Sequence, residues 1–391
     1  MNHVSLRHRF PGIQDGWARF DGPAGTQMVD VAIQAVADWM SGPDYACGGG
    51  FFAASQASSD LVDRARVTVG QLLGADPNGV TFGPNMTSLT FSISRAIAAT
   101  LKPGDRIIGT RLDHDANITP WKLAADSAGA DHILASFDPA TGMMPVEHVI
   151  DLIDERTKWV TLPGASNLLG TVPDHGPIIE AAHAAGARVF IDAVAWAPHV
   201  PLDIAALGCD ALVTSPYKWY GPHSGVMWMQ PDLLQSLPVL KVRPSYDEGP
   251  SRFETGMPNF EALAGVDAAA RFLLDQGLDQ IAAYEMELFA PLLDGLKSIP
   301  GVVVYGSHTL DHRTPTAAFT IAGVSPTEAA RAMADDKIAV WDGHNYAIEV
   351  VDQLGLADTG GVIRAGLSRY SEPDDVQRLL KTTERLATLG R

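Results

Sequence analysis

Residues 211–222 read Ala-Leu-Val-Thr-Ser-Pro-Tyr-Lys-Trp-Tyr-Gly-Pro, a short apolar run followed by an isolated lysine among aromatic residues. The continuous apolar run predicts a strand buried on both faces, which is typical of a parallel sheet covered by helices. Crowded apolar surroundings disfavour the charged form of Lys218, so its amine can act as a nucleophile. The alternative is a lysine that lies along the surface with its ammonium group in water.

The same pattern extends to both sides of this stretch. Short strand-like runs alternate with segments whose apolar residues recur about every 3.6 positions, as in helices. We expect strands at 80–83, 106–110, 132–137, 158–163, 188–194, 211–215 and 225–229, and helices that include 61–73, 146–156 and 177–185. This alternation predicts an α/β fold with a mostly parallel seven-stranded sheet.

The pattern changes after Pro244, where a Gly- and Pro-rich stretch leads into a long helical region at 261–297. A smaller α/β set follows, with strands expected at 302–305, 316–321, 338–340 and 362–367, and helices near 326–335 and from 373 onward. The sequence therefore predicts a large domain, 1–260, and a smaller C-terminal domain, 261–391. This division leaves open that the N-terminal segment packs with the small domain.

The net charge, the number of cysteines and the length of the apolar runs exclude several classes of protein. The formal net charge of −18 makes nucleic acid and anionic membrane surfaces poor partners, because phosphate binding depends on cationic surface. Only two cysteines, Cys47 and Cys209, are present, too few for a disulfide framework or a cysteine metal site. No signal peptide and no apolar run long enough for a membrane span is found, so we expect a cytoplasmic protein.

A carboxylate and a set of helix-opening residues accompany the lysine. Asp192 ends an apolar strand, where ligands of open α/β sheets bind, although a helix cap or a buried ion pair is an equal alternative. In residues 81–90 a strand ends at Gly83, and Asn85 and Thr87 open a helix. The amides at such a junction bind phosphate, while ordinary N-capping by Asn85 or Thr87 is the simpler interpretation.

His114 lies between two aspartates in residues 111–121. Adjacent residues rarely face one ion, so no metal is expected, and His114 is free to lie against a planar ligand. Taken together, a phosphate cradle, an acid at a strand end and a reactive lysine after the next strand are what pyridoxal 5′-phosphate (PLP) requires. The lysine forms the Schiff base, and the acid keeps the pyridine nitrogen protonated.

From about Phe20 to the last helix the chain resembles class V, fold-type I PLP enzymes, and within them the cysteine desulfurase-like group. The resemblance is carried by Asp192 and by residues 209–222, 113–121, 166–171, 253–259 and 364–368. It implies a PLP cofactor, an amino-acid substrate and a homodimer, in which residues 253–259 correspond to the loop that crosses between subunits.

The resemblance also implies a role for each matching residue. Lys218 would bind the cofactor and move protons, Asp192 would pair with the pyridine nitrogen, and His114 would stack on the ring. Asn167 would lie near the phenolic oxygen and the substrate carboxylate, which Arg364 would bind. Without the resemblance, Arg364 is a charge at a strand end. The phosphate would be held by Ser215, Tyr217, Asn85, Thr87 and the amides around Met86.

Departures from the family are equally informative. Desulfurases carry a catalytic cysteine on a mobile loop, whereas the corresponding loop here, residues 340–347, has Tyr346 at that position and His344 beside it. Cys47 and Cys209 do not match the position. Ala195 and Met257 replace residues that are usually polar near the cofactor and its phosphate.

These features predict a PLP-dependent lyase or transferase that acts on an amino acid. Elimination with C–S cleavage of a cysteine-derived substrate is favoured over persulfide transfer. The alternatives are a class V aminotransferase, an epimerase, and a decarboxylating or oxidative enzyme. A PLP-binding protein without turnover is the alternative from another class, and it would not consume added amino acid. No G-x-G-x-x-G motif supports a nucleotide-dependent oxidoreductase.

Overall fold

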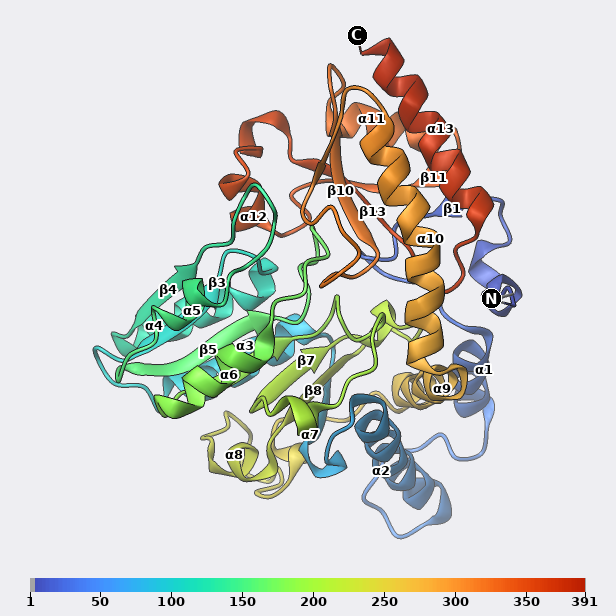
Figure 1. Cartoon of the computed structure of the whole chain (residues 1–391). Coiled ribbons are helices and arrows are strands. Elements are labelled where there is room, and N and C mark those ends of the chain that lie inside the picture. The colour runs from blue at the N-terminus through green and yellow to red at the C-terminus, as the bar shows by residue number, and fades with distance from the viewer. Residues whose placement is uncertain (1–3, 391) are drawn as a thin grey trace.

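The computed structural model describes residues 4–390 and contains one large sheet and two small ones (Figure 1). The seven strands of the large sheet are β2 (Val80–Gly83), β3 (Arg106–Thr110), β4 (Asp131–Ala135), β5 (Thr157–Pro163), β6 (Arg188–Asp192), β7 (Ala211–Thr214) and β8 (Gly225–Met229). Their order is β2-β8-β7-β6-β5-β3-β4, and β8 is antiparallel to both of its neighbours. The predicted mostly parallel seven-stranded sheet is confirmed.

Helices cover both faces of this sheet, which explains its continuously apolar strands. Phe190 and Val213 pack with α3 and α4 on one face, whereas Ile191 and Leu212 pack with α2 and α6 on the other. The helices of this part of the chain are α1 (Asp30–Ser41), α2 (Ala53–Leu73), α3 (Met86–Ala98), α4 (Thr119–Ala128), α5 (Glu147–Ile150), α6 (His175–Ala184), α7 (Ile204–Leu207), α8 (Pro231–Ser236) and α9 (Phe260–Gln276).

The C-terminal part has its own apolar core between an antiparallel sheet and long helices (Figure 1). The sheet order is β12-β13-β10-β9, and β1 pairs with β11 beside it. The elements are β1 (Ala18–Arg19), β9 (Val302–Tyr305), β10 (Thr316–Ile321), β11 (Ile338–Ala339), β12 (Trp341–Gly343), β13 (Val362–Gly366), α10 (Leu278–Ser298), α11 (Pro326–Asp335), α12 (Ile348–Gln353) and α13 (Pro373–Leu389). The domain division at residue 260 stays a prediction.

Two expected helices differ from the observed ones. The segment 146–156 forms only α5, because a turn follows in which the Asp154 carboxylate accepts the N–H of Arg156. The region 261–297 is two helices, α9 and α10, because Gly277 between them has φ 76°, which ends α9.

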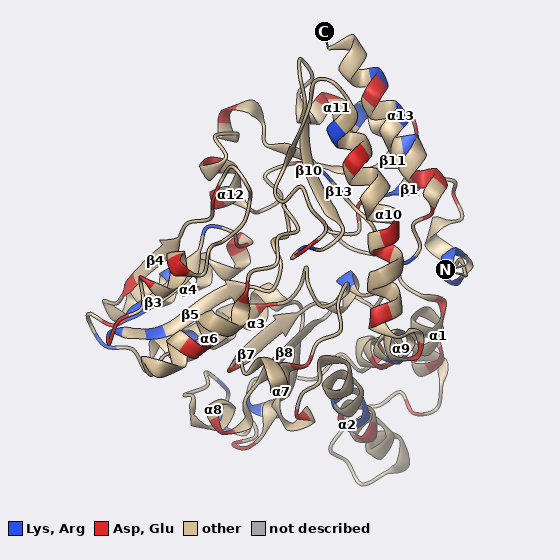
Figure 2. Ribbon diagram, viewed as in Figure 1, with Lys and Arg blue, Asp and Glu red and all other residues tan. Residues whose placement is uncertain are grey.

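Acidic residues are spread over the helices of both parts rather than gathered in one patch (Figure 2). Among residues 4–390, no helix is both long and apolar enough to cross a membrane.

Candidate active site

A cavity lies at the carboxyl ends of four neighbouring parallel strands, β3, β5, β6 and β7, where α/β proteins bind ligands. The residues that line it are Met86, Thr87, His114, Pro163, Ala165, Asn167, Asp192, Val194, Ala195, Tyr217 and Lys218. The structure therefore brings together side chains that are far apart in the sequence. Pro163, Ala165 and Val194 were not predicted, although each stands at or just after the end of an expected strand.

Lys218 ends a short 3₁₀ turn, Pro216–Lys218, that follows β7. Its amine donates a hydrogen bond to the carbonyl of Pro23 and lies 5.5 Å from the centre of the Tyr217 ring. Burial of the amine, together with the positive charge of Arg364, lowers its pKa to about 7, while Asp192 acts in the opposite direction. Much of the amine is therefore neutral at physiological pH.

Asp192 is the last residue of β6 and is 6% exposed. One carboxylate oxygen accepts the N–H of Val194 at 3.0 Å. Burial raises the pKa of Asp192 to about 6, and the bond from Val194 and the charge of Lys218 only partly oppose this. A buried acid of this kind favours a cationic hydrogen-bond donor as its partner.

The N-terminus of α3 faces the cavity beside the turn after β7. The N–H of Met86 donates to Ser215 Oγ at 3.3 Å, and Thr87 lies on the cavity wall. Amides and hydroxyls at a helix N-terminus suit an anion such as phosphate. Asn85 does not line the cavity, because its side chain caps α3 by accepting the N–H of Ser88 at 2.8 Å.

His114 follows β3 and is held as a neutral imidazole. Its Nδ1 accepts the N–H of Ala116 at 3.0 Å, which leaves the hydrogen on Nε2. Burial, reinforced by the charges of Lys218 and Arg364, lowers the pKa of His114 to about 3. The adjacent Asp113 is anchored by Thr110 at 2.5 Å and by Asn117 at 2.8 Å, so the backbone before His114 is fixed.

Arg364, on β13, reaches the large sheet from the C-terminal part. Its Nη1 donates to the backbone carbonyl of Asn167 at 3.0 Å. Two buried polar atoms here, Arg364 Nε and Asn167 Oδ1, have no hydrogen-bond partner among residues 4–390. Because buried polar groups are normally paired, a donor and an acceptor left open beside the cavity fit a polar ligand.

The loop at 343–347 packs on two residues of the cavity wall, His114 and Asn167, from outside the cavity; Tyr346 itself does not line the cavity and is 66% exposed. The ring of Tyr346 stacks on His114, with centroids 5.3 Å apart and planes at 21°. Asn345 and Tyr346 both have left-handed backbones, with φ of 50° and 60°. Two hydrogen bonds of 2.8 Å hold the loop. The N–H of Asp115 donates to the Tyr346 carbonyl, and Nδ2 of Asn167 donates to the Asn345 carbonyl.

His344 lies in this loop but does not line the cavity. Its Nδ1 accepts the N–H of Tyr346 at 3.0 Å, and its ring meets that of Tyr346 edge-on. The side chain thus supports the loop and stays beside the exposed face of Tyr346.

Neither cysteine lines the cavity. Cys209 is buried, and burial raises the pKa of its thiol to about 12, whereas Cys47 is exposed on a glycine-rich loop. Within residues 4–390, no three or more His, Cys, Asp or Glu side chains are grouped as a metal would need.

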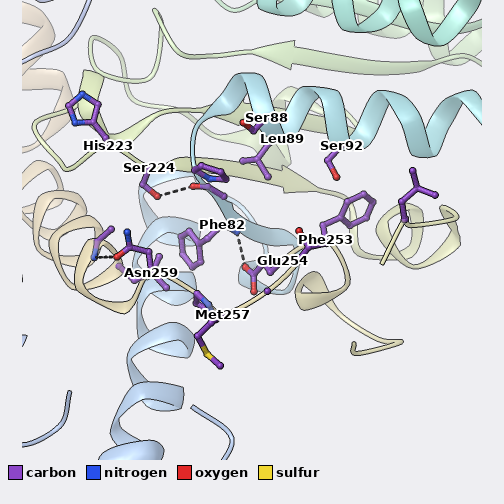
Figure 3. Close-up of a pocket in the computed structure, with 18 of the residues that line it drawn as sticks. Phe82, Ser88, Leu89, Ser92, His223, Ser224, Phe253, Glu254, Met257 and Asn259 are labelled. Carbon is purple, nitrogen blue, oxygen red and sulfur yellow. Dashed lines mark hydrogen bonds between the residues drawn. The ribbon is translucent and has the colours of Figure 1, made fainter. Parts of the chain in front are cut away.

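A second cavity of about 430 Å³ lies beside α3, which contributes Ser88, Leu89 and Ser92 to its lining (Figure 3). One wall is the segment 253–259, which the Glu254 carboxylate fastens to the N–H of Phe82 at 2.8 Å and to Arg66 at 2.6 Å. Met257, at the tip of this segment, is 62% exposed. The segment therefore leaves an apolar side chain in solvent next to the site.

The sequence is similar to a known protein family over most of its length. Residues 19–379 match the family model for aminotransferase class-V. The chain belongs to the aminotransferase class-V family. As a member, it is a PLP-dependent enzyme of the fold-type I class.

Several relatives extend the comparison. An uncharacterized protein of Mycobacterium tuberculosis is 32% identical over 98% of both chains. A probable cysteine desulfurase of Mycolicibacterium paratuberculosis is 31% identical over 95% of this chain, which spans 55% of that protein's length. The crystal structure of the cysteine desulfurase CsdA of Escherichia coli covers 98% of both chains, with 27% identity and a TM-score of 0.88.

Proposed function

We propose that the protein cleaves the C–S bond of a cysteine-derived amino acid by PLP-dependent elimination, without a protein persulfide. The observation that carries the proposal is the loop at 343–347. It sets the phenol of Tyr346 against His114, at the position where the resemblance expects a thiolate. Neither Cys47 nor Cys209 lines the cavity, which supports a reaction that stores no sulfur on the enzyme.

The residues around the cavity fit the cofactor. Lys218 would bind it covalently, Asp192 would hold the protonated ring nitrogen, and His114 would lie on the ring face. Its phosphate suits the start of α3, where Thr87 and the Met86 amide adjoin the polar side chains Ser215 and Tyr217. When bound, PLP supplies an electron sink for the electron pair left when a bond at the substrate α-carbon breaks.

The side chains of the protein supply binding and proton transfer. Arg364 binds the substrate carboxylate through its open Nε, which selects α-amino acids. Lys218 would accept the substrate's α-proton, and an amine whose pKa is about 7 is well matched to this task at physiological pH. The leaving thiolate takes a proton or a hydrogen bond from the Tyr346 hydroxyl, with His344 next to it as a further donor.

The aminotransferase is the second candidate, because the matching family model carries that name. Both reactions begin with removal of the α-proton by Lys218. In elimination the C–S bond then breaks, the sulfur leaves as a thiol, and hydrolysis of the remaining three-carbon product by one water gives pyruvate and ammonia. In transamination the carbon skeleton keeps its sulfur and leaves as a keto acid, while its amino group passes to a second keto acid that acts as acceptor.

The test is a screen of the purified holoenzyme with amino acids and S-substituted cysteines, with separate assays for pyruvate, ammonia, thiol, CO₂ and keto acid. Equal amounts of pyruvate, ammonia and thiol support the proposal. A keto acid that retains the side chain, CO₂ release or α-epimerisation overturns it. A Lys218→Ala variant serves as control, because it is expected to lose the yellow, borohydride-trapped cofactor.

We further propose that the enzyme works as a cytoplasmic homodimer. The exposed Met257 and the cavity behind segment 253–259 support a subunit contact beside the active site (Figure 3). Large apolar side chains nearby, Leu240, Val242 and Tyr246, are also exposed, which is typical of a surface that a partner covers.

A further inference from the structure

A buried carboxylate lies outside the cavity, on the helix that runs between the two parts of the chain. This helix, α10, begins beside α9 and reaches the level of the antiparallel sheet (Figure 1). Glu285, in its first half, has no exposed surface. Its Oε2 lies 2.7 Å from Nδ1 of His199, and its Oε1 accepts the hydroxyl of Tyr220 at 3.3 Å. A buried charge is tolerated only when such partners are present.

Each partner of this carboxylate belongs to a segment that also carries a residue of the site. His199 lies in the turns that follow Asp192, and Tyr220 follows Lys218 by one intervening residue. The Tyr220 hydroxyl also accepts the backbone N–H of Arg369, in the segment after Arg364, at 2.9 Å. One buried network therefore joins the three segments of Asp192, Lys218 and Arg364.

Tyr220 itself has an unusual backbone. Its φ is 70°, a left-handed conformation that a bulky residue adopts only where its surroundings fix it. Its N–H donates to Thr26 Oγ1 and its carbonyl accepts the N–H of Val29, both at 3.0 Å. The Tyr220 hydroxyl is held as well, by Glu285 and by the N–H of Arg369. Loss of the hydroxyl removes these two bonds, so it is expected to loosen the turn that carries Lys218.

We infer that Glu285, His199 and Tyr220 form a positioning network that holds the Lys218 segment in register with those of Asp192 and Arg364. This inference rests on the proposed function, because it takes Lys218 as the cofactor-binding lysine. None of the three residues lines the cavity, so they act through the segments that they join. Disturbing the network is therefore expected to change cofactor electrostatics and amino-acid binding together.

The test uses the Tyr220→Phe holoenzyme, which keeps the ring and loses only the hydroxyl. Without substrate, the pH midpoint of the cofactor's absorbance change is expected to shift by about half a unit or more, because the Lys218 amine moves relative to the charged groups that face it. Those groups, Asp192, His114 and Arg364, are unchanged by the substitution. The dissociation constant of the amino acid, read from the same spectra, is expected to rise at least about threefold as the Arg364 segment loosens.

Two further variants make the result decisive. Glu285→Gln keeps the size of the side chain, but its amide NH₂ group would face either His199 or Tyr220, both of which donate to Glu285 in the wild type. One of the two bonds is therefore lost, and the pH midpoint of the cofactor's absorbance change is expected to move as well. Tyr305→Phe is the control, because its hydroxyl lies 3.2 Å from Thr320 Oγ1 within the antiparallel sheet. A fall in melting temperature with unchanged midpoint and amino-acid binding in both network variants overturns the inference.

Borohydride trapping of the wild-type enzyme distinguishes a failure of the positioning network from a failure of the proposed function. If the trapped cofactor maps to Lys218 while the network variants keep the wild-type midpoint, only the positioning network is refuted. If it maps to another residue, the proposed function fails first.

Discussion

The Lys218 amine is expected to capture PLP at a rate that rises through pH 7 and then levels off. Only the neutral amine attacks a carbonyl carbon. With its pKa lowered to about 7, about half of the amine is neutral at pH 7. A lysine at the ordinary value of 10.5 has only about one part in three thousand neutral at that pH. Burial therefore raises the neutral fraction of the amine at pH 7 by about three orders of magnitude, and the rate of capture rises with it.

The assay mixes apoenzyme with PLP at a series of pH values and follows the cofactor's absorbance, with borohydride quenching to confirm capture on Lys218. Two variants move the midpoint in opposite directions. Arg364→Gln removes a charge that lowers the pKa of Lys218, so the midpoint rises. Asp192→Asn removes a charge that raises this pKa, so the midpoint falls. Ratios to the wild type cancel the titration of the cofactor itself.

A wild-type midpoint near 10 would mean that the amine remains solvated and that burial does not lower its pKa. A shift in the same direction by both variants would mean that Arg364 and Asp192 do not act on Lys218 through their charges, since those charges have opposite signs.

Four other outcomes are expected. Asp192→Asn should keep the fold and lose at least tenfold in rate, or about 1.4 kcal/mol, in steady-state assays; near-native turnover contradicts its role. Tyr346→Phe should change the rate or the product ratio while the cofactor spectrum stays intact, and a persulfide on Cys47 or Cys209 that a carrier discharges would restore the desulfurase interpretation. No rate transition between pH 5 and 8 should come from His114, whose pKa is about 3, so a transition there that His114→Asn removes speaks against a neutral imidazole. Light scattering should give a dimer, and a fully active monomer argues against the proposed interface.

The sheet could be predicted because its strands are apolar on both faces and are separated by helical spacing. The same logic placed Asp192 at a strand end and Lys218 after the next strand, and the two meet because β6 and β7 are neighbours in the sheet. Asn85 shows the limit of this reasoning. A polar residue at the start of a helix either binds a ligand or caps the helix, and sequence does not separate these uses. The structure shows the cap.

Other features leave no local signal. β1 is two residues long and becomes a strand only by pairing with β11, more than 300 residues later in the chain. Glu285 lies on the buried face of α10, four residues from both Ile281 and Phe289, but its partners His199 and Tyr220 are distant in sequence and no local pattern identifies them. Likewise, nothing in the spacing around Tyr346 predicts that its ring stacks on His114.

The left-handed backbone at Asn345 and Tyr346 has an evolutionary consequence. A tyrosine codon becomes a cysteine codon by a single base change, so a thiol at position 346 is always one mutation away. Such a thiol would inherit a backbone fastened to Asp115 and Asn167. It would lack the freedom to swing out and hand sulfur to an acceptor. If the proposed function holds, a Tyr346→Cys substitution alone is not expected to give sulfur transfer, because the two bonds that hold the loop would also have to be lost.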